Sequence, residues 1–167
     1  MRLPIAVAVV VMALLLSQVA RAETKLVEEF KDWTLYSHTG APADICFIAS
    51  QPKEAKPPSS LNQASFFYVS HWPKDGVKQE VSIKVGREIK DGTGVSVVIF
   101  NDSFELFTKG DKAFVNDPNQ ELKLIDAMKR GNIMTVKLTG KDGQEVEEVY
   151  SLQGVTAAIG RLVQGCS

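Results

Sequence analysis

Short alternations of apolar and polar residues dominate the chain after residue 22. In residues 81–85, valine and isoleucine alternate with serine and lysine, which is typical of a strand with one buried and one solvated face. Similar runs occupy residues 30–36, 44–50, 95–100 and 134–139, and turn residues separate them. This succession predicts a mainly β fold, an antiparallel β-sandwich or meander of about eight to nine strands.

Two segments show the helical period instead. Asp117 and Pro118 have the chemistry of an N-cap and a first-turn proline, and Gly131 supplies a stop. The expected apolar faces of the two helices are Leu122, Ile125 and Met128 in the first, and Val155, Ile159 and Leu162 in the second. The sequence therefore predicts two short helices, one before the last hairpin and one at the C-terminus.

The first 22 residues have the pattern of a cleaved secretory signal. Arg2 precedes an apolar run over residues 5–16, and Ala20-Arg21-Ala22 has the small-x-small form that signal peptidase cuts. The apolar run has 12 residues, whereas a transmembrane helical anchor needs about 20. A buried N-terminal helix of the domain is the other alternative, but it would leave the basic start and the cleavage pattern unexplained. We therefore expect residues 23–167 to form a single exported domain without a stable membrane anchor. Its expected location is extracytoplasmic: the periplasm first, with secretion or outer-membrane association as alternatives.

The charge balance argues against nucleic acid as a partner. Removal of Arg2 and Arg21 from the 19 basic residues leaves 17 against 20 acidic ones. Proteins that bind nucleic acid usually carry a clustered basic face, and no run of lysine and arginine occurs in the sequence.

The only two cysteines, Cys46 and Cys166, lie near the two ends of the expected domain. Oxidising compartments form and keep disulfides, so an exported chain with two cysteines favours one bond between them. Two unpaired thiols are the alternative. A bond would make residues 150–166 a structural lock on the fold, since it would join the end of the last helix to an early strand.

Residues 66–72 carry the richest aromatic run of the chain. Aromatic side chains in such a strand most often belong to a core. If Phe67 and Val69 face inward, however, Phe66, Tyr68 and Trp72 lie on the other side. An exposed row of that kind would be a contact surface.

No catalytic or metal-binding pattern stands out. His38 and His71 are the only histidines, and two histidines without further ligands make a poor zinc site. There is no Gly-x-Ser-x-Gly elbow and no phosphate-binding loop. We expect no cofactor, no metal and no enzyme activity. The acidic pair Glu147-Glu148 is expected on solvated faces, with one of the two carboxylates beside a lysine.

Motifs spread over nearly the whole of residues 23–167 resemble one family, the invasion-associated locus B proteins. They are Trp33, Cys46-Phe47-Ile48-Ala49-Ser50-Gln51-Pro52, Phe67-Tyr68-Val69-Ser70, Leu106-Phe107-Thr108-Lys109-Gly110-Asp111, Ala127-Met128-Lys129-Arg130-Gly131 and Tyr150-Ser151-Leu152-Gln153-Gly154 running into Thr156-Ala157-Ala158. The resemblance implies an exported, mostly β protein of a Gram-negative bacterium without an established active site. Some members have a further cysteine where this chain has Ser37, which leaves Cys46 and Cys166 as the pair.

Two classes of function follow. The first is a non-enzymatic exported interaction protein that contributes to host-cell invasion, with a protein or cell-surface partner. The second is a periplasmic ligand-binding or hydrolytic domain whose residues come from separate loops. An envelope-maintenance role unrelated to hosts is a further alternative. A deep pocket with converging polar groups would favour the second class, and a filled core with a flat aromatic or charged patch would favour the first.

Overall fold

The computed structural model describes residues 22–40 and 44–165. The expected signal segment, apart from Ala22, and Cys166 lie outside the described residues. The strands are β1 (Glu23–Phe30), β2 (Trp33–Thr39), β3 (Ile45–Ser50), β4 (Glu54–Lys56), β5 (Phe66–Trp72), β6 (Val77–Lys84), β7 (Val95–Ile99), β8 (Asp102–Lys109), β9 (Lys112–Phe114), β10 (Ile133–Thr139) and β11 (Glu145–Ser151). The helices are the 3-10 turn η1 (Pro58–Asn62), α1 (Pro118–Arg130) and α2 (Val155–Leu162).

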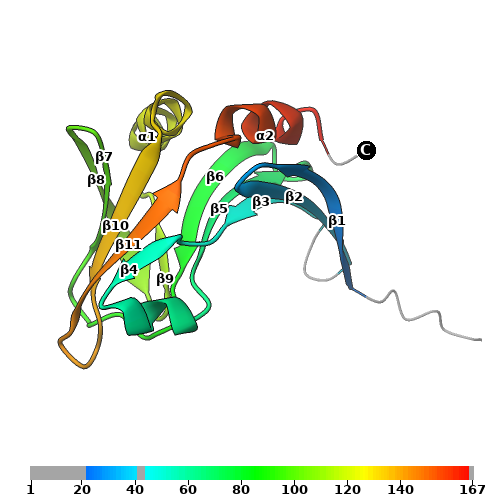
Figure 1. Cartoon of the computed structure of the whole chain (residues 1–167). Coiled ribbons are helices and arrows are strands. Elements are labelled where there is room, and N and C mark those ends of the chain that lie inside the picture. The colour runs from blue at the N-terminus through cyan, green and yellow to red at the C-terminus, as the bar shows by residue number, and fades with distance from the viewer. Residues whose placement is uncertain (1–21, 41–43, 166–167) are drawn as a thin grey trace, which may run out of the picture.

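Within the described residues, eleven strands form one strongly curved sheet in the order β1-β2-β3-β5-β6-β9-β8-β7-β10-β11-β4 (Figure 1). Their pairings are antiparallel. The expected mainly β, antiparallel architecture with two helices is therefore confirmed, with more strands than the eight to nine predicted.

Two of the additional strands lie at the edges of the sheet. β1 was not among the predicted strands, because polar and charged residues occupy five of its eight positions and no clean apolar alternation marks it. β4 was not predicted either, because Pro52, Pro57 and Pro58 lie on both sides of its three residues, which form a strand by pairing with β11. The expected strand over residues 30–36 was also wrong at its start, since a turn at Lys31 and Asp32 separates β1 from β2.

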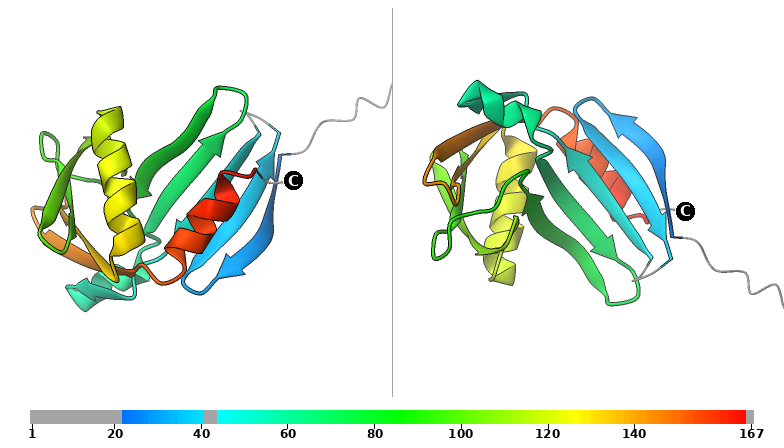
Figure 2. Two further views of the ribbon diagram at one scale, coloured as in Figure 1. Left: turned by 90° about the horizontal axis from the view of Figure 1, so that it is seen from above. Right: turned by 90° about the horizontal axis from the view of Figure 1, so that it is seen from below.

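Both α-helices cover the same, concave face of the sheet (Figure 2). α2 packs on β1, β2, β3 and β5, and α1 packs on β6, β8 and α2. None of the helices in the described ranges is long and apolar enough to cross a bilayer.

The core lies between this face and the helices. Trp33, Leu35, Phe67 and Val69 are fully buried from the sheet side, and Leu162 from α2. The Trp33 indole N–H donates to the Ser151 carbonyl at 3.0 Å, so the start of β2 is tied to the end of β11. The predicted apolar stripe of α2 is confirmed.

α1 begins and ends as the sequence predicts, but its buried face differs. Asp117 caps the helix by accepting from the Asn119 backbone N–H at 2.7 Å. The buried residues are Leu124, Ile125, Ala127 and Met128, whereas Leu122 is 57% exposed. The expected position of Leu122 in the core was wrong, because the stripe centred on Leu124 and Met128 meets the sheet and leaves Leu122 outside it.

Candidate interaction surface

The sheet face opposite the helices carries a row of aromatic side chains. On β2 and β3, Tyr36 is directly opposite Phe47, and on β8 and β9, Phe107 is directly opposite Phe114. Alternation along each strand turns these side chains away from the core residues. We call Tyr36, Phe47, Phe66, Tyr68, Phe107 and Phe114 the aromatic face.

The rings of the aromatic face contact one another. The ring centroids of Tyr36 and Phe47 are 5.3 Å apart, and those of Phe47 and Tyr68 are 5.8 Å apart. Phe66 stacks on Tyr68 at 5.8 Å, and Phe107 tilts over Phe114 at 5.6 Å. These contacts leave five of the six side chains half-buried and Phe107 48% exposed. The rings therefore fix one another's positions while part of each remains open to solvent.

The contact surface expected from the sequence lies on this side of the sheet. Phe67 and Val69 are fully buried, whereas Phe66, Tyr68 and Trp72 are half-buried. All three therefore retain exposed area. Their role as a contact surface stays a prediction.

A groove of about 260 Å³ crosses β5, β6 and β9 on this side. Tyr68, Trp72 and Phe114 form its apolar walls, and Glu80 and Lys84 are among its charged residues. The Trp72 indole Nε1 is buried and makes no hydrogen bond within the described part of the chain. Burial, followed by the neighbouring Tyr36, raises the pKa of the Tyr68 phenol, so that hydroxyl stays protonated at neutral pH.

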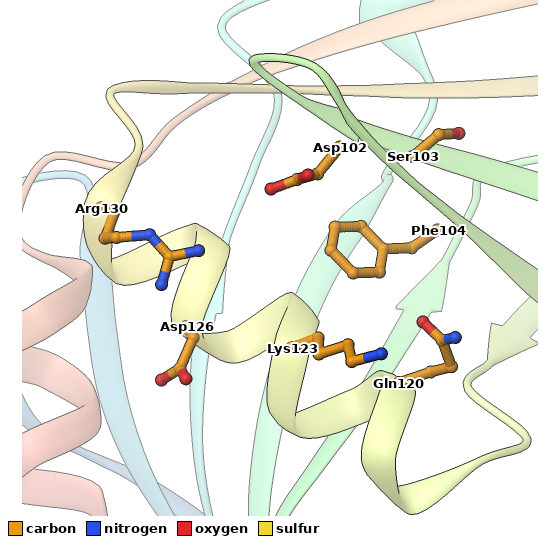
Figure 3. A pocket seen from close by; sticks show the side chains of 7 residues that line it. All are labelled: Asp102, Ser103, Phe104, Gln120, Lys123, Asp126 and Arg130. Atoms are coloured by element: carbon orange, nitrogen blue, oxygen red, sulfur yellow. The ribbon is translucent and has the colours of Figure 1, made fainter.

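A second groove, of about 470 Å³, lies between α1 and β8 (Figure 3). Its lining residues are Asp102, Ser103, Phe104, Gln120, Lys123, Asp126 and Arg130. In Figure 3 the Lys123 side chain points toward the Phe104 ring, while the Asp126 carboxylate points away from it. Only Phe104 is buried. The groove thus offers exposed charges of both signs, but no buried group poised for acid–base chemistry.

Among the described residues, the most deeply buried carboxylate belongs to Glu148, which is 2% exposed. Ser65 donates to its Oε1 at 2.7 Å, and the Tyr150 hydroxyl donates to its Oε2 at 2.9 Å. Loss of solvation raises the pKa of Glu148, against the lowering effects of these two donors and of the Arg87 charge. The expectation of a solvated Glu148 was wrong, because Glu148 is on the concave face of β11. Its neighbour Glu147 faces out and pairs with Lys56 and Lys137.

Arg87 extends the polar cluster around Glu148 to the surface. Its guanidinium donates to Gln63 Oε1 at 2.9 Å, to Ser60 Oγ at 3.0 Å and to Gln144 Oε1 at 3.0 Å. The hollows nearby are lined by Arg87 rather than by Glu148. This geometry fits a structural clamp between η1 and the β10–β11 hairpin better than a reaction centre. Sequence reasoning missed this cluster, because its hydrogen-bonded pairs lie up to 83 positions apart in the chain.

The histidines lie on separate strands. His38 on β2 shares a 2.7 Å hydrogen bond between its Nδ1 and the Thr24 hydroxyl. His71 lies on β5 beside Cys46 of β3, and its Nδ1 is buried without a hydrogen bond in the described ranges. Among residues 22–40 and 44–165, no group of three histidine, cysteine or acidic side chains could hold a metal ion.

Comparisons with known proteins identify one family. The family model described as Invasion associated locus B (IalB) protein matches residues 33–163. A crystal structure of invasion associated protein B from Bartonella henselae is similar, with a TM-score of 0.60 and 16% sequence identity, over 84% of this chain and 97% of that chain. At this identity the likeness shows a shared fold. No curated protein matches the chain.

Proposed function

Because the chain belongs to the invasion-associated locus B family, we propose that it is an exported, non-enzymatic interaction protein that binds its partner through the aromatic face. The observation that carries this proposal is the placement of six aromatic side chains on the sheet face that neither α-helix covers. Aromatic residues are enriched at protein interfaces, where they supply large contact area with little conformational entropy to lose. Rings that already contact one another lose even less conformational entropy on binding.

The signal pattern of residues 1–22 supports export, with the periplasm as the first expected location and secretion or outer-membrane association as the next. The Bartonella protein is described as invasion associated. By analogy we assign this chain a contribution to host-cell invasion through a protein or cell-surface partner. The analogy concerns the fold and the family, and it carries no residue assignment.

The test combines export and binding. We expect the periplasmic fraction of the producing bacterium to contain a chain that begins at Glu23, measured by intact mass. We also expect purified residues 23–167 to bind the surface of cultured host cells. The double substitution Phe66→Ser and Phe107→Ser should reduce this binding at least about tenfold, because both rings expose area on the aromatic face.

The matched control is Leu122→Ser with Ile133→Ser. These residues are 57% and 59% exposed and lie on α1 and β10, away from the aromatic face. Both double variants should keep the native circular dichroism spectrum and midpoint of unfolding within a few degrees. Equal loss of cell binding in the two variants would contradict the assignment of the surface.

The groove between α1 and β8 favours one alternative, a periplasmic ligand-binding or hydrolytic domain. Its volume of about 470 Å³ is within the range of small-molecule sites. The substitutions Lys123→Ala and Asp126→Ala separate the two functions, since they alter this groove and leave the aromatic face intact. A deletion strain with a leaky envelope and unchanged invasion would instead favour the envelope-maintenance role.

A further inference from the structure

Three lysines stand side by side next to the aromatic face. Lys84 on β6 is directly opposite Lys112 on β9, and Lys112 is directly opposite Lys109 on β8. All three are exposed, and none forms an ion pair within the described part of the chain. We call Lys84, Lys109 and Lys112 the lysine row.

Like charges directly opposite one another on neighbouring strands are destabilising. The same side of the sheet avoids this arrangement in its other half, where charges of opposite sign alternate. There Glu147 on β11 is opposite Lys56 on one side and Lys137 on the other. It is 3.6 Å and 3.7 Å from their ammonium nitrogens. The lysine row therefore has no charge compensation of the kind that the sheet uses elsewhere.

The lysine row runs parallel to part of the aromatic face. Tyr68, Ser82, Phe114 and Phe107 are paired in sequence across β5, β6, β9 and β8. A second line of paired residues lies two positions further along the same strands. It begins with Phe66 opposite Lys84, and Lys84 is the first member of the lysine row. Neighbouring strands are about 4.8 Å apart, and two residues along a strand cover about 7 Å. An elongated ligand lying across the strands can therefore contact rings along one side and ammonium groups along the other.

The groove beside these two rows adds hydrogen-bonding groups. It contains the hydroxyls of Ser70 and Ser82 and the carboxylate of Glu80, and Lys84 and Lys112 also line it. Trp72, another wall of the groove, brings a buried indole N–H without a partner in the described residues. Donors and acceptors among aromatic walls fit a ligand with many hydroxyl groups, whose C–H faces can pack on the rings.

On this basis we propose that the lysine row and the aromatic face together bind an acidic polysaccharide, a chain of sugar rings with carboxylate or sulfate groups. The proposal rests on the proposed function and names its partner's chemistry. The sugar rings pack on Tyr68, Phe114 and Phe107, and the acid groups lie over the lysine row.

Two other occupants fit less well. An extended peptide binds a sheet by adding a strand to an edge, whereas β6 and β9 are interior strands whose backbone groups pair with neighbours. A lipid surface is bound by apolar side chains that protrude into the acyl region. Within the aromatic face, Phe107 is exposed and the other five side chains are half-buried.

The test measures binding of purified residues 23–167 to polygalacturonate, to dextran sulfate and to uncharged dextran by isothermal titration calorimetry. We expect at least one acidic polysaccharide to bind and uncharged dextran not to bind. The triple substitution of Lys84, Lys109 and Lys112 by glutamine should weaken this binding at least about tenfold and reduce its dependence on salt concentration. Loss of like-charge repulsion should leave the variant at least as stable as the native chain.

The matched control replaces Lys90, Lys123 and Lys129 by glutamine. These three lysines are also exposed and form no ion pair in the described ranges, so the net charge changes equally while the lysine row is intact. Binding within about twofold of native supports the proposal. Equal weakening in both triple variants, or absence of binding to both acidic polysaccharides, overturns it.

Two further probes test the choice of partner. Tighter binding to poly-L-glutamate, or to phosphatidylglycerol vesicles, than to either acidic polysaccharide overturns the polysaccharide assignment. Binding to host cells separates this inference from the proposed function. Cell binding that depends on Phe66 and Phe107 but not on the lysine row contradicts the inference alone. Cell binding that depends on neither contradicts the proposed function as well.

Discussion

Glu148 shows how one buried carboxylate can be accommodated without a counter-ion in direct contact. Both of its oxygens accept a hydrogen bond, from Ser65 and from Tyr150, and the Gly86 backbone N–H in turn donates to Ser65 Oγ at 3.3 Å. A buried polar group with its partners in place costs much less than one left unpaired. The arrangement fixes the segment that precedes β5, at Ser65, relative to β11.

The raised pKa of Glu148 makes stability depend on pH. Burial is the main cause, and it lifts the pKa above the ordinary value of 4.5. The folded state then holds the proton more tightly than the unfolded state, so this contribution is complete below pH 4.5 and is lost as the pH rises through the folded pKa. Glu148→Gln cannot ionise, and urea unfolding should show a smaller fall in stability from pH 4.5 to neutral pH than in the native chain.

The control for this experiment is Glu29→Gln, a substitution at an exposed position of β1, which should leave the native pH profile unchanged. Parallel profiles for Glu148→Gln and the native chain would contradict the prediction. Glu148→Ala removes the acceptor altogether, and it should destabilise the fold at all pH values by about 1–3 kcal/mol, because Ser65 and Tyr150 lose their partner.

Gly154 is a position where the fold requires the absence of a side chain. It precedes α2 with φ +91°, and a Cβ there would overlap the Phe30 carbonyl oxygen. Gly154→Ala should therefore lower the free energy of unfolding by at least about 2 kcal/mol. Gly143→Ala is the matched control, since φ is +82° there but the space is open. Its cost should be limited to about 1–2 kcal/mol of backbone strain. Similar chemical-denaturation midpoints for both variants would refute the close approach.

α1 is specified locally at its ends and by tertiary packing along its side. Its cap and its stop follow from the chemistry of Asp117 and Gly131. Which side of α1 is buried depends on the sheet, because the Glu121 carboxylate of the helix accepts a hydrogen bond from the Val81 backbone N–H of β6 at 2.7 Å. That contact turns the Glu121 side of the helix toward β6 and helps to place Leu122 outside the core.

The cap gives a prediction of its own. Asp117→Ala removes the acceptor for the Asn119 N–H and should destabilise the chain by about 0.5–2 kcal/mol. Asp126→Ala, which removes an exposed carboxylate from the middle of the same helix, should change stability by less than about 0.5 kcal/mol. Thermal unfolding of the two variants checks this difference, and an equal loss in both would argue against the cap.

The same division between local and tertiary information explains what could be predicted from the sequence. Strands with clean alternation, such as β6 and β10, and the stripe of α2 were predictable, because a period of two or 3.6 depends only on neighbours in the chain. β4 was not, since its three residues form a strand only through pairing with β11. The side of Phe66 and Tyr68 could be predicted, but the alignment of Lys84, Lys112 and Lys109 requires the register of three strands.

The whole molecule is held together by contacts between its two ends. α2 packs over β2 and β3, and the Asp32 backbone N–H donates to the Gln153 carbonyl at 3.3 Å. Cys46 on β3 is 3% exposed and lies on the sheet side that α2 covers. Cys166 is outside the described residues, so the bond between the two cysteines stays a prediction. The placement of α2 is compatible with it.

We expect a peptide that contains Cys46 to remain linked to one that contains Cys166 when the protein from the periplasmic fraction is digested without reductant, as mass spectrometry can show. Loss of the bond in Cys46→Ser or Cys166→Ser should cost about 2–4 kcal/mol, because it releases the constraint on a long loop of the unfolded chain. The native protein in reductant should be destabilised to a similar extent. Two alkylatable thiols in the untreated protein from that fraction would exclude the bond.

The position of β4 has a consequence for the order of folding. The segment between β3 and β5 crosses to the far edge of the sheet, where Ala55 pairs with Glu148. In the export that we propose, the chain emerges from a translocation channel N-terminus first, and β1, β2, β3, β5 and β6 can pair with one another early. The far edge must wait until residues up to 151 have emerged. Until then β4 lacks its partner strand β11, and Ser65 lacks the Glu148 carboxylate. The segment between β3 and β5 is therefore a part of the early chain that a chaperone or a protease would meet unfolded.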